Sequence, residues 1–446
     1  MNKVVTVLIL VFALSYAVLI GPFRGADEPN HFFRAFHVSE GGVLAIHGSE
    51  GIVGQFLPTS LLTLAQIAGA LPKIPEMRTS PEQLHAAAQV PLNSNHRILV
   101  NFPNTALYSP LNYLFPAIGI DIGRVFSANP LLLFYLARIF SALFGVSLFA
   151  FGINLLPLPA QSLRVFALIP MVLFQTGMIT ADTITIALGF ICAAEILRIR
   201  FISRILALPR RIELLCLALI LSQLRLPYPM IGLAVFAIPS TRFRDRSDAR
   251  RFFILFFATL TLPCLLWNAT VPALFSQMRP GTVTNPLEQM RLIVRAPSHF
   301  LAAFGWELGH RGLSHFRELL GFFGWRNFPL PLSLIIVLSV AIAISVCSFE
   351  PSALELTWRV RIFFLTLAAA GLVAVALFIY LMWNAVGVHE IAGFHGRYFL
   401  PFLPFALIAL ANDSLKKMSS LPIVAIVICL VANLLALGLL ARATFV

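Results

Sequence analysis

Charged side chains are scarce in this sequence. Asp, Glu, Lys and Arg make up only 11% of its 446 residues, against 59% hydrophobic residues. The mean hydropathy of +0.88 excludes a soluble domain of this length, because such a domain could not keep that much apolar surface from water. Negatively charged residues are rarer than positively charged ones, with 19 Asp and Glu against 32 Lys and Arg. The basic residues stand between apolar runs, where they set membrane orientation and do not indicate nucleic-acid binding. The sequence predicts a polytopic membrane protein.

Several chemical signatures are also lacking. The five cysteines all fall inside apolar runs, so they form neither a disulfide framework nor a metal-binding spacing. There is no Gly-rich phosphate loop, no nucleophile elbow and no zinc motif, which argues against nucleotide-driven chemistry on the cytoplasmic side. Asp27, Glu28 and Asp182 offer oxygen ligands suited to a hard divalent cation. No metal or other cofactor is predicted.

Long apolar runs are abundant, and about 20 such residues cross a hydrocarbon core. The run 212–240 reads as two shorter spans broken at Arg225-Leu226-Pro227-Tyr228-Pro229. The other expected spans are 4–21, 131–155, 165–180, 183–197, 252–270, 329–348, 362–384, 398–411 and 421–440. We therefore expect a single all-α transmembrane domain over residues 1–446, with about eleven helices.

The segment 107–126 is apolar but carries two prolines and ends near Asp121 and Arg124. If it stays at the interface or re-enters, all the basic clusters fall in cytoplasmic loops, as the positive-inside rule requires. If it crosses, every cluster moves outside. These clusters are Arg198/Arg200/Arg204/Arg210/Arg211, Arg242/Arg244/Arg246/Arg250/Arg251, Arg359/Arg361 and Lys416/Lys417. We therefore expect the long external loops 22–130 and 271–328, a short external turn near Asp182, and a last external loop, 385–397.

The first polar constellation follows the first span directly. Asp27 and Glu28 precede Pro29, with His31 and Arg34 within two helical turns. A carboxylate at an outer membrane surface can serve as a general base towards an acceptor hydroxyl. The alternative is a helix cap, because Asp followed by Pro in the first turn also resembles a helix start. The sequence leaves both interpretations open.

A second constellation lies where the last external loop enters a span, around His395, Arg397 and Tyr398. Glycines at 393 and 396 permit tight turns, and the planar guanidinium of Arg397 suits phosphate oxygens. Snorkelling of Arg397 and an aromatic-belt role for Tyr398 are the alternatives.

Further candidates lie in the first loop and the spans after it. Tyr108, Asn112 and Tyr113 could line a sugar site, and Arg138 could face a lipid phosphate. Belt tyrosines and a snorkelling arginine are the alternatives here. Asp182 either orients an acceptor or caps the helix that begins near Thr183.

Together these stretches resemble a bacterial polytopic membrane family catalogued as a domain of unknown function and placed by similarity among GT-C-type glycosyltransferases. The resemblance rests on Ala26-Asp27-Glu28-Pro29-Asn30-His31-Phe32-Phe33-Arg34-Ala35, Ser39-Glu40-Gly41, Tyr108-Ser109-Pro110-Leu111-Asn112-Tyr113, Arg138, Asp182 and Gly393-Phe394-His395-Gly396-Arg397-Tyr398-Phe399-Leu400-Pro401. The first and last stretches are fairly specific, the middle ones generic. His395 stands where the family pattern leads us to expect Gln. This difference retains a side chain that can form hydrogen bonds.

The resemblance implies an inverting glycosyltransferase that uses a polyprenyl-phosphate sugar and an envelope-glycan or lipid-linked acceptor. It would work at the external face of the bacterial cytoplasmic membrane, in contact with the bilayer and without nucleic acid. By this analogy Asp27 is the general base, supported by Glu28, and Arg397 and Arg138 hold the donor phosphate. The expected substrate-binding residues are His31, Arg34, Tyr108, Asn112, Tyr113, Asp182, His395 and Tyr398.

Two other functions remain open on the sequence. A flippase for lipid-linked saccharides would place polar residues through the membrane midplane and often shows internal repeats. The spans here are apolar at their centres and no repeat is visible. A non-catalytic subunit of an envelope-assembly complex would tolerate loss of Asp27.

Overall fold

The structure is a computed structural model, and it describes residues 2–48, 51–71, 78–157, 160–202, 204–271, 282–348, 356–415, 418 and 420–445. The basic pair Lys416 and Lys417 lies outside the described residues, as does part of the second large loop.

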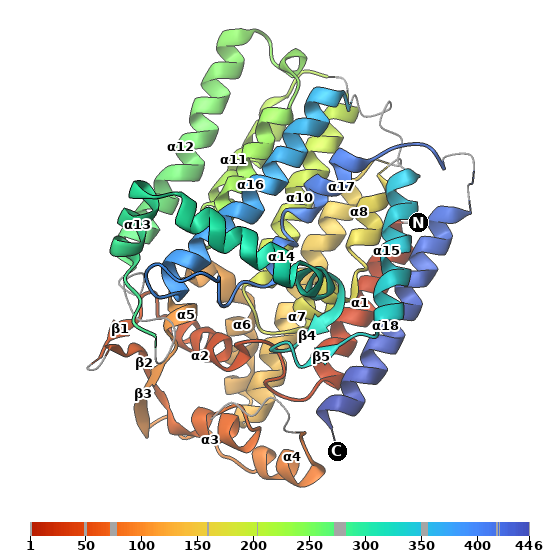
Figure 1. Cartoon of the computed structure of the whole chain (residues 1–446). Helices are drawn as coiled ribbons and strands as arrows, with labels where there is room; N and C mark the ends of the chain where they lie inside the picture. The colour runs from red at the N-terminus through yellow and green to blue at the C-terminus, as the bar shows by residue number, and fades with distance from the viewer. Residues whose placement is uncertain are drawn as a thin grey trace.

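Helices make up most of the chain (Figure 1). The α-helices are α1 (Asn2–Leu19), α2 (Glu28–Ser39), α3 (Thr59–Ile67), α4 (Pro81–Ala88), α5 (Pro103–Ala106), α6 (Leu114–Val125), α7 (Pro130–Leu155), α8 (Gln161–Phe166), α9 (Pro170–Gly177), α10 (Asp182–Phe201), α11 (Leu208–Leu221), α12 (Arg246–Thr270), α13 (Pro286–Arg295), α14 (Ser298–Gly321), α15 (Leu332–Cys347), α16 (Trp358–Trp383), α17 (Leu403–Leu410) and α18 (Leu421–Thr444).

The remaining elements are short. The 3₁₀ helices are η2 (Pro110–Tyr113), η3 (Tyr228–Ala237), η4 (Ser240–Arg242) and η7 (Gly396–Phe399). The strands are β1 (Ile46–His47), β2 (Val53–Pro58), β3 (Arg97–Asn101), β4 (Phe322–Phe323) and β5 (Phe328–Pro329). An antiparallel sheet of order β1-β2-β3 and the β4–β5 hairpin were not expected from the sequence.

In the described part of the chain, five helices are long and apolar enough to cross a membrane: α1, α7, α12, α16 and α18. This confirms a membrane-embedded, mostly helical protein. The other expected spans coincide with α9, α11, η3, α15 and α17, which have 8 to 16 residues, and with α10, which has 20 residues but carries Asp182, Glu195, Arg198 and Arg200. The count of eleven crossings therefore stays a prediction.

The segment expected to stay at the interface contains α6, which has 12 residues. At 1.5 Å per residue such a helix is about 18 Å long, less than the roughly 30 Å of a hydrocarbon core. It packs against α7, to which a short turn connects it.

Two of the basic clusters lie together at one end of the bundle. α10 runs from Asp182 to the arginines near its C-terminus, and α11 begins beside them. The guanidinium of Arg211 binds Asp248 with two contacts of 2.6 Å, and Arg242 donates to the carbonyl of Ile199 at 3.1 Å. The loops that precede α11 and α12 therefore lie together, and Asp182 lies at the other end of α10.

The first and last helices run in the same direction. Tyr16 donates to the Asn433 side chain at 3.1 Å, and the Gly21 N–H donates to the Thr444 hydroxyl at 3.5 Å. An odd number of crossings would give this parallel arrangement. The two marked chain ends accordingly lie at different heights of the bundle in Figure 1.

The expected first external loop is a small folded layer. Residues of α2, β2, α3, α5 and η2 share an apolar core that includes Phe32, Leu57, Leu61 and Tyr113, and this core continues onto α7 through Phe134. Figure 1 shows the layer covering one end of the bundle, where α1 ends.

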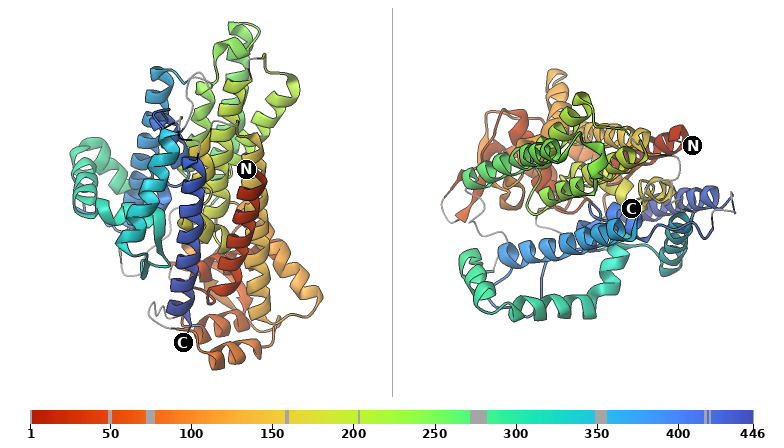
Figure 2. Two further views of the ribbon diagram at one scale, coloured as in Figure 1. Left: turned by 90° about the vertical axis from the view of Figure 1, so that its right-hand side faces the viewer. Right: turned by 90° about the horizontal axis from the view of Figure 1, so that it is seen from above.

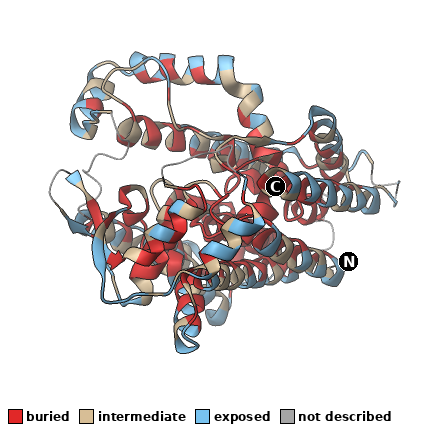
Figure 3. Ribbon diagram, turned by 90° about the horizontal axis from the view of Figure 1, so that it is seen from below, coloured by how far each residue is buried: buried red, intermediate tan, exposed pale blue. Residues whose placement is uncertain are grey.

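The second large loop is also helical where it is described. α14 crosses the bundle in Figure 1, and Figure 2 shows α13 and α14 outside the main group of helices. Glu307 and Glu318 of α14 are buried, whereas Leu301 and Leu313 are more than 60% exposed. Both glutamates of α14 therefore face inward, whereas its exposed side carries Leu301 and Leu313 together with His299 and His310. Figure 3 shows the alternation of buried and exposed residues along such peripheral helices.

Candidate functional site

A cavity of about 230 Å³ lies at the end of the bundle covered by the folded first loop. Its wall combines segments from the start of α2, the ends of α9 and α16, the start of α10, the break before η3, the β4–β5 turn and the loop into η7. The lining residues are Ala26, Asp27, His31, Asn104, Thr105, Tyr108, Gln175, Thr180, Asp182, Arg225, Trp325, Ile379, Trp383, Gly393, His395, Arg397 and Tyr398.

The cavity brings together most of the residues expected at the site, although they are far apart in the sequence. These are Asp27, His31, Tyr108, Asp182, His395, Arg397 and Tyr398. The other expected residues do not line it: Glu28, Arg34, Asn112, Tyr113 and Arg138.

Asp27 stands at the N-cap position of α2, but its side chain makes no capping hydrogen bond. The helix-cap interpretation of Asp27 is therefore wrong. Its backbone is left-handed, with φ of 55°, a conformation that Asp tolerates better than most residues. The indole N–H of Trp325 donates to its carboxylate at 3.4 Å. Asp27 thus presents its carboxylate to the cavity and not to the helix.

Glu28 instead forms a buried ion pair with Arg138. The two side chains are fully buried and meet through contacts of 2.7 and 2.8 Å. Glu28 also accepts from the Gly25 and Ile179 N–H groups, and Arg138 donates to carbonyls at the end of α1, including that of Ile20. This pair fastens α2 to α7 and α1, so neither side chain is directed at the cavity. A three-carboxylate metal site with Asp27 and Asp182 is not formed.

His31 lines the cavity and is held from behind by Tyr113. A hydrogen bond of 2.7 Å joins His31 Nδ1 to the Tyr113 hydroxyl. Burial lowers the pKa of His31 to about 4, although Asp27 and Asp182 act in the opposite direction. The imidazole is therefore neutral near pH 7 and can donate or accept one hydrogen bond from a polar ligand.

Arg34 and Asn112 support the backbone behind the cavity. Arg34 donates to the Tyr108 carbonyl at 3.3 Å, and Asn112 donates to the Gln223 carbonyl at 3.1 Å. The second contact ties the first loop to the end of α11, next to Arg225. These two residues therefore shape the wall without lining it.

The second carboxylate lies beside Arg397. Asp182 is the first residue of α10, and the cap position belongs to Ala181, which makes no side-chain capping bond. The Asp182 carboxylate is 3.7 Å from Arg397 Nε. Burial lowers the pKa of Arg397, but Tyr398, Asp182 and Asp27 raise it further than burial lowers it, so the guanidinium stays charged.

Arg225 is a site residue that the sequence interpretation missed. It lies in the break between α11 and η3, and its guanidinium carbon is 5.1 Å from the Tyr108 ring and 5.4 Å from the Tyr398 ring. Within the described residues, the buried Nε atoms of Arg225 and Arg397 have no hydrogen-bond partner. The available signal was an arginine followed by Leu-Pro-Tyr-Pro inside an apolar run, which marks irregular backbone at a cavity.

Two tryptophans were also missed. Trp325 comes from the β4–β5 turn and Trp383 from the end of α16. Gly393 has φ of +82°, and a Cβ there would come within 2.7 Å of the Trp383 ring. The expected tight turn at Gly393 is therefore confirmed, and it brings the loop against an aromatic wall.

The cavity thus combines carboxylates, guanidinium groups and aromatic rings. Over the residues the structure describes, no group of three or more His, Cys, Asp or Glu is arranged to hold a metal ion. Such a cavity can bind an anionic group at the arginines, stack a ring on the aromatics and accept a proton at a carboxylate.

A family model described as "Predicted membrane protein (DUF2142)" matches residues 9–406. No curated protein and no solved structure matches the chain.

Proposed function

The chain belongs to the DUF2142 family of predicted membrane proteins, and from the residues of its cavity we propose that it is a GT-C-type membrane glycosyltransferase. It takes a sugar from a polyprenyl-phosphate donor and transfers it to a hydroxyl of an envelope glycan or lipid-linked acceptor. The reaction takes place at the external face of the bacterial cytoplasmic membrane.

The observation that carries this proposal is the pairing of two partly unsatisfied arginines with two carboxylates in one cavity. A buried guanidinium N–H without a partner is costly, and a phosphate oxygen would satisfy it. The Nε atoms of Arg225 and Arg397 make no hydrogen bond within the described part of the chain, although that of Arg397 lies 3.7 Å from the Asp182 carboxylate. We assign the donor phosphate to these two residues, because Arg138 is occupied by Glu28.

The reaction is a single displacement. An acceptor hydroxyl oxygen attacks the anomeric carbon, its proton passes to the Asp27 carboxylate, and the bond from that carbon to the phosphate oxygen breaks. The electron pair leaves with the phosphate, whose charge Arg225 and Arg397 stabilise. One displacement inverts the anomeric centre. Glu28 acts through its ion pair with Arg138 to hold the start of α2, and so is a positioning residue.

The distribution of charge supports an external site. The cavity lies at the end of α10 that carries Asp182, whereas Arg198 and Arg200 stand at the other end. α16 likewise runs from Arg359 and Arg361 to the cavity residue Trp383. If the basic end is cytoplasmic, as the positive-inside rule requires, the cavity opens outside. The eleven-span topology proposed from the sequence gives the same face.

The test is sugar transfer from a panel of polyprenyl-phosphate sugars by purified wild type and Asp27→Asn. Asparagine tolerates the left-handed backbone but cannot take the proton. We expect transfer to fall by roughly 10²–10⁴-fold with no change in thermal unfolding.

The matched control is Asp121→Asn, in the same loop, whose half-exposed carboxylate contacts Arg124. It should transfer at the wild-type rate. Full activity of Asp27→Asn would reject Asp27 as the base. Absence of transfer by folded wild type with every donor would reject the transferase.

A further inference from the structure

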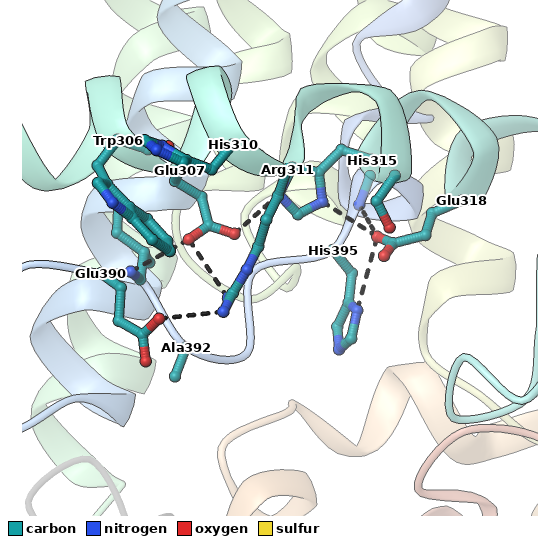
Figure 4. Close-up of polar contacts among 12 residues, drawn as sticks. Trp306, Glu307, His310, Arg311, His315, Glu318, Glu390, Ala392 and His395 are labelled. Carbon is teal, nitrogen blue, oxygen red and sulfur yellow. Dashed lines mark hydrogen bonds and ion pairs between the residues drawn. The ribbon is translucent and has the colours of Figure 1, made fainter.

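Three buried titratable side chains on α14 lie next to the cavity without lining it. Glu307, His315 and Glu318 are all less than 7% exposed. Figure 4 shows their contacts with the loop that carries His395. Burying carboxylates is costly unless they are paired, so this cluster needs a reason within the structure.

His315 lies between the two carboxylates. Its Nε2 is 2.9 Å from Glu307 Oε1 and its Nδ1 is 3.2 Å from Glu318 Oε2. With both carboxylates ionised, each can only accept, so both ring nitrogens donate and the ring is an imidazolium. The cluster therefore holds a proton that an isolated histidine would lose near neutral pH.

The two carboxylates also hold the backbone of the loop into η7. Glu318 accepts from the Gly396 N–H at 2.6 Å, and Glu307 accepts from the Ile391 N–H at 3.3 Å. Gly396 immediately precedes Arg397. A Cβ on Gly396 would collide with the carbonyl oxygen of His315, so the loop packs directly on the α14 backbone.

We propose that Glu318 and His315 are positioning residues that fix the loop 391–397, and with it Arg397, at the cavity, and that they do so only while His315 keeps both ring protons. The part concerning Arg397 rests on the proposed function. The holding of the loop does not.

Other charged groups contact the cluster. Arg311 of α14 is 3.6 Å from Glu307, Arg326 of the β4–β5 turn is 2.7 Å from Glu318, and His395 of the loop is 3.7 Å from Glu318. With these groups present, burial lowers the pKa of His315, but its bonds to Glu307 and Glu318 raise it above the ordinary value. The stabilisation is therefore complete below about pH 6.5 and is lost as pH rises through the higher folded pKa.

The same two segments offer a matched control. Arg311 also pairs with Glu390 at 3.0 Å, again joining α14 to this loop, but the side chains are 35% and 48% exposed. An exposed pair of this kind contributes little. Glu390→Gln and Glu318→Gln therefore make the same chemical change in contacts between the same segments.

The experiment is hydrogen exchange of amides 391–399 in the full-length protein at about pH 6 and about pH 9, corrected for intrinsic rates. We expect wild type and Glu390→Gln to be protected at the lower pH and to lose protection roughly tenfold or more at the higher. Glu318→Gln and His315→Gln should be unprotected at both. The wild-type pH series needs no variant, so it tests the proposal even if a variant fails to fold.

Equal protection in Glu318→Gln and wild type, or protection in wild type that does not change with pH, would overturn the proposal. Donor KM gives a second measurement, and Glu318→Gln should raise it while Glu390→Gln does not. If exchange behaves as expected but wild type transfers no sugar, the holding of loop 391–397 by Glu318 and His315 is supported and the transferase function is rejected.

Discussion

Single residues in this protein take roles that their neighbours do not share. Asp27 and Glu28 are adjacent, yet one faces the cavity and the other is fully buried against Arg138. The left-handed backbone at Asp27 turns the two side chains in different directions. Adjacent acids therefore divide into one available for proton transfer and one that holds the wall.

Arg138→Met tests the structural role of the ion pair. It leaves the Glu28 carboxylate buried without a cation, and breaking a buried pair in this way costs about 3–5 kcal/mol of unfolding free energy. The double variant Glu28→Gln/Arg138→Met should lose less than the sum of the single variants, because it leaves no lone charge. Thermal unfolding in detergent measures both effects.

Arg124→Met is the comparison, since Arg124 contacts Glu40 and Asp121 with partly exposed side chains. Exposed pairs contribute about 0–1 kcal/mol, so this change should be nearly silent. A similar loss in Arg124→Met and Arg138→Met would contradict the structural assignment.

At the scale of elements, α14 is the part that sequence reasoning could not place. Leucines on its exposed side and glutamates on its buried side are the opposite of what a helix in water shows. Its apolar residues are also interrupted by charged ones, so no membrane span is predicted there. The helices α1, α7, α12, α16 and α18 were predictable because length and apolarity alone define them.

The close approach of α14 to the loop before η7 predicts the effect of Gly396→Ala. The added methyl group would meet the His315 carbonyl, which belongs to a helix and cannot move alone. Overpacking of this kind costs about 1–3 kcal/mol. We expect a lower unfolding temperature and faster exchange of amides 391–399 than in wild type.

Gly309→Ala is the matched change on α14 itself, because no atom lies within 4 Å of a Cβ placed there. It should leave both measurements unaltered or raise the unfolding temperature slightly, since Ala favours helix over Gly. If Gly396→Ala behaved like Gly309→Ala, the contact between loop and helix would be looser than described.

At the scale of the whole molecule, the cavity lies at one end of the bundle, and the arginines at the C-terminus of α10 and the N-terminus of α16 lie at the other. Single-cysteine variants at Glu390 and Arg244, both exposed, would show which end is outside. An impermeant maleimide applied to intact cells should label Glu390→Cys and reach Arg244→Cys only after permeabilisation. The reverse pattern would place the cavity in the cytoplasm and reject the proposed external reaction.

The gathering of site residues was predictable in part. Counting the membrane crossings places Asp27, Asp182 and Arg397 on one side without any knowledge of contacts, and the structure brings these three to one cavity. The number of crossings cannot show that Arg138 forms an ion pair with Glu28, a contact between residues 110 positions apart. It also cannot show that Arg225 reaches the cavity, because that depends on how the break between α11 and η3 folds.

The left-handed backbone at Asp27 also limits how this position can vary among related chains. A related protein that lost the catalytic activity would no longer need a carboxylate at position 27, but it would still need the left-handed turn that starts α2. Glycine and asparagine accept that turn readily, whereas other residues strain it by about 1–3 kcal/mol. Inactive descendants should therefore carry Gly or Asn at position 27, and a bulky side chain there would mark a relative whose α2 begins differently.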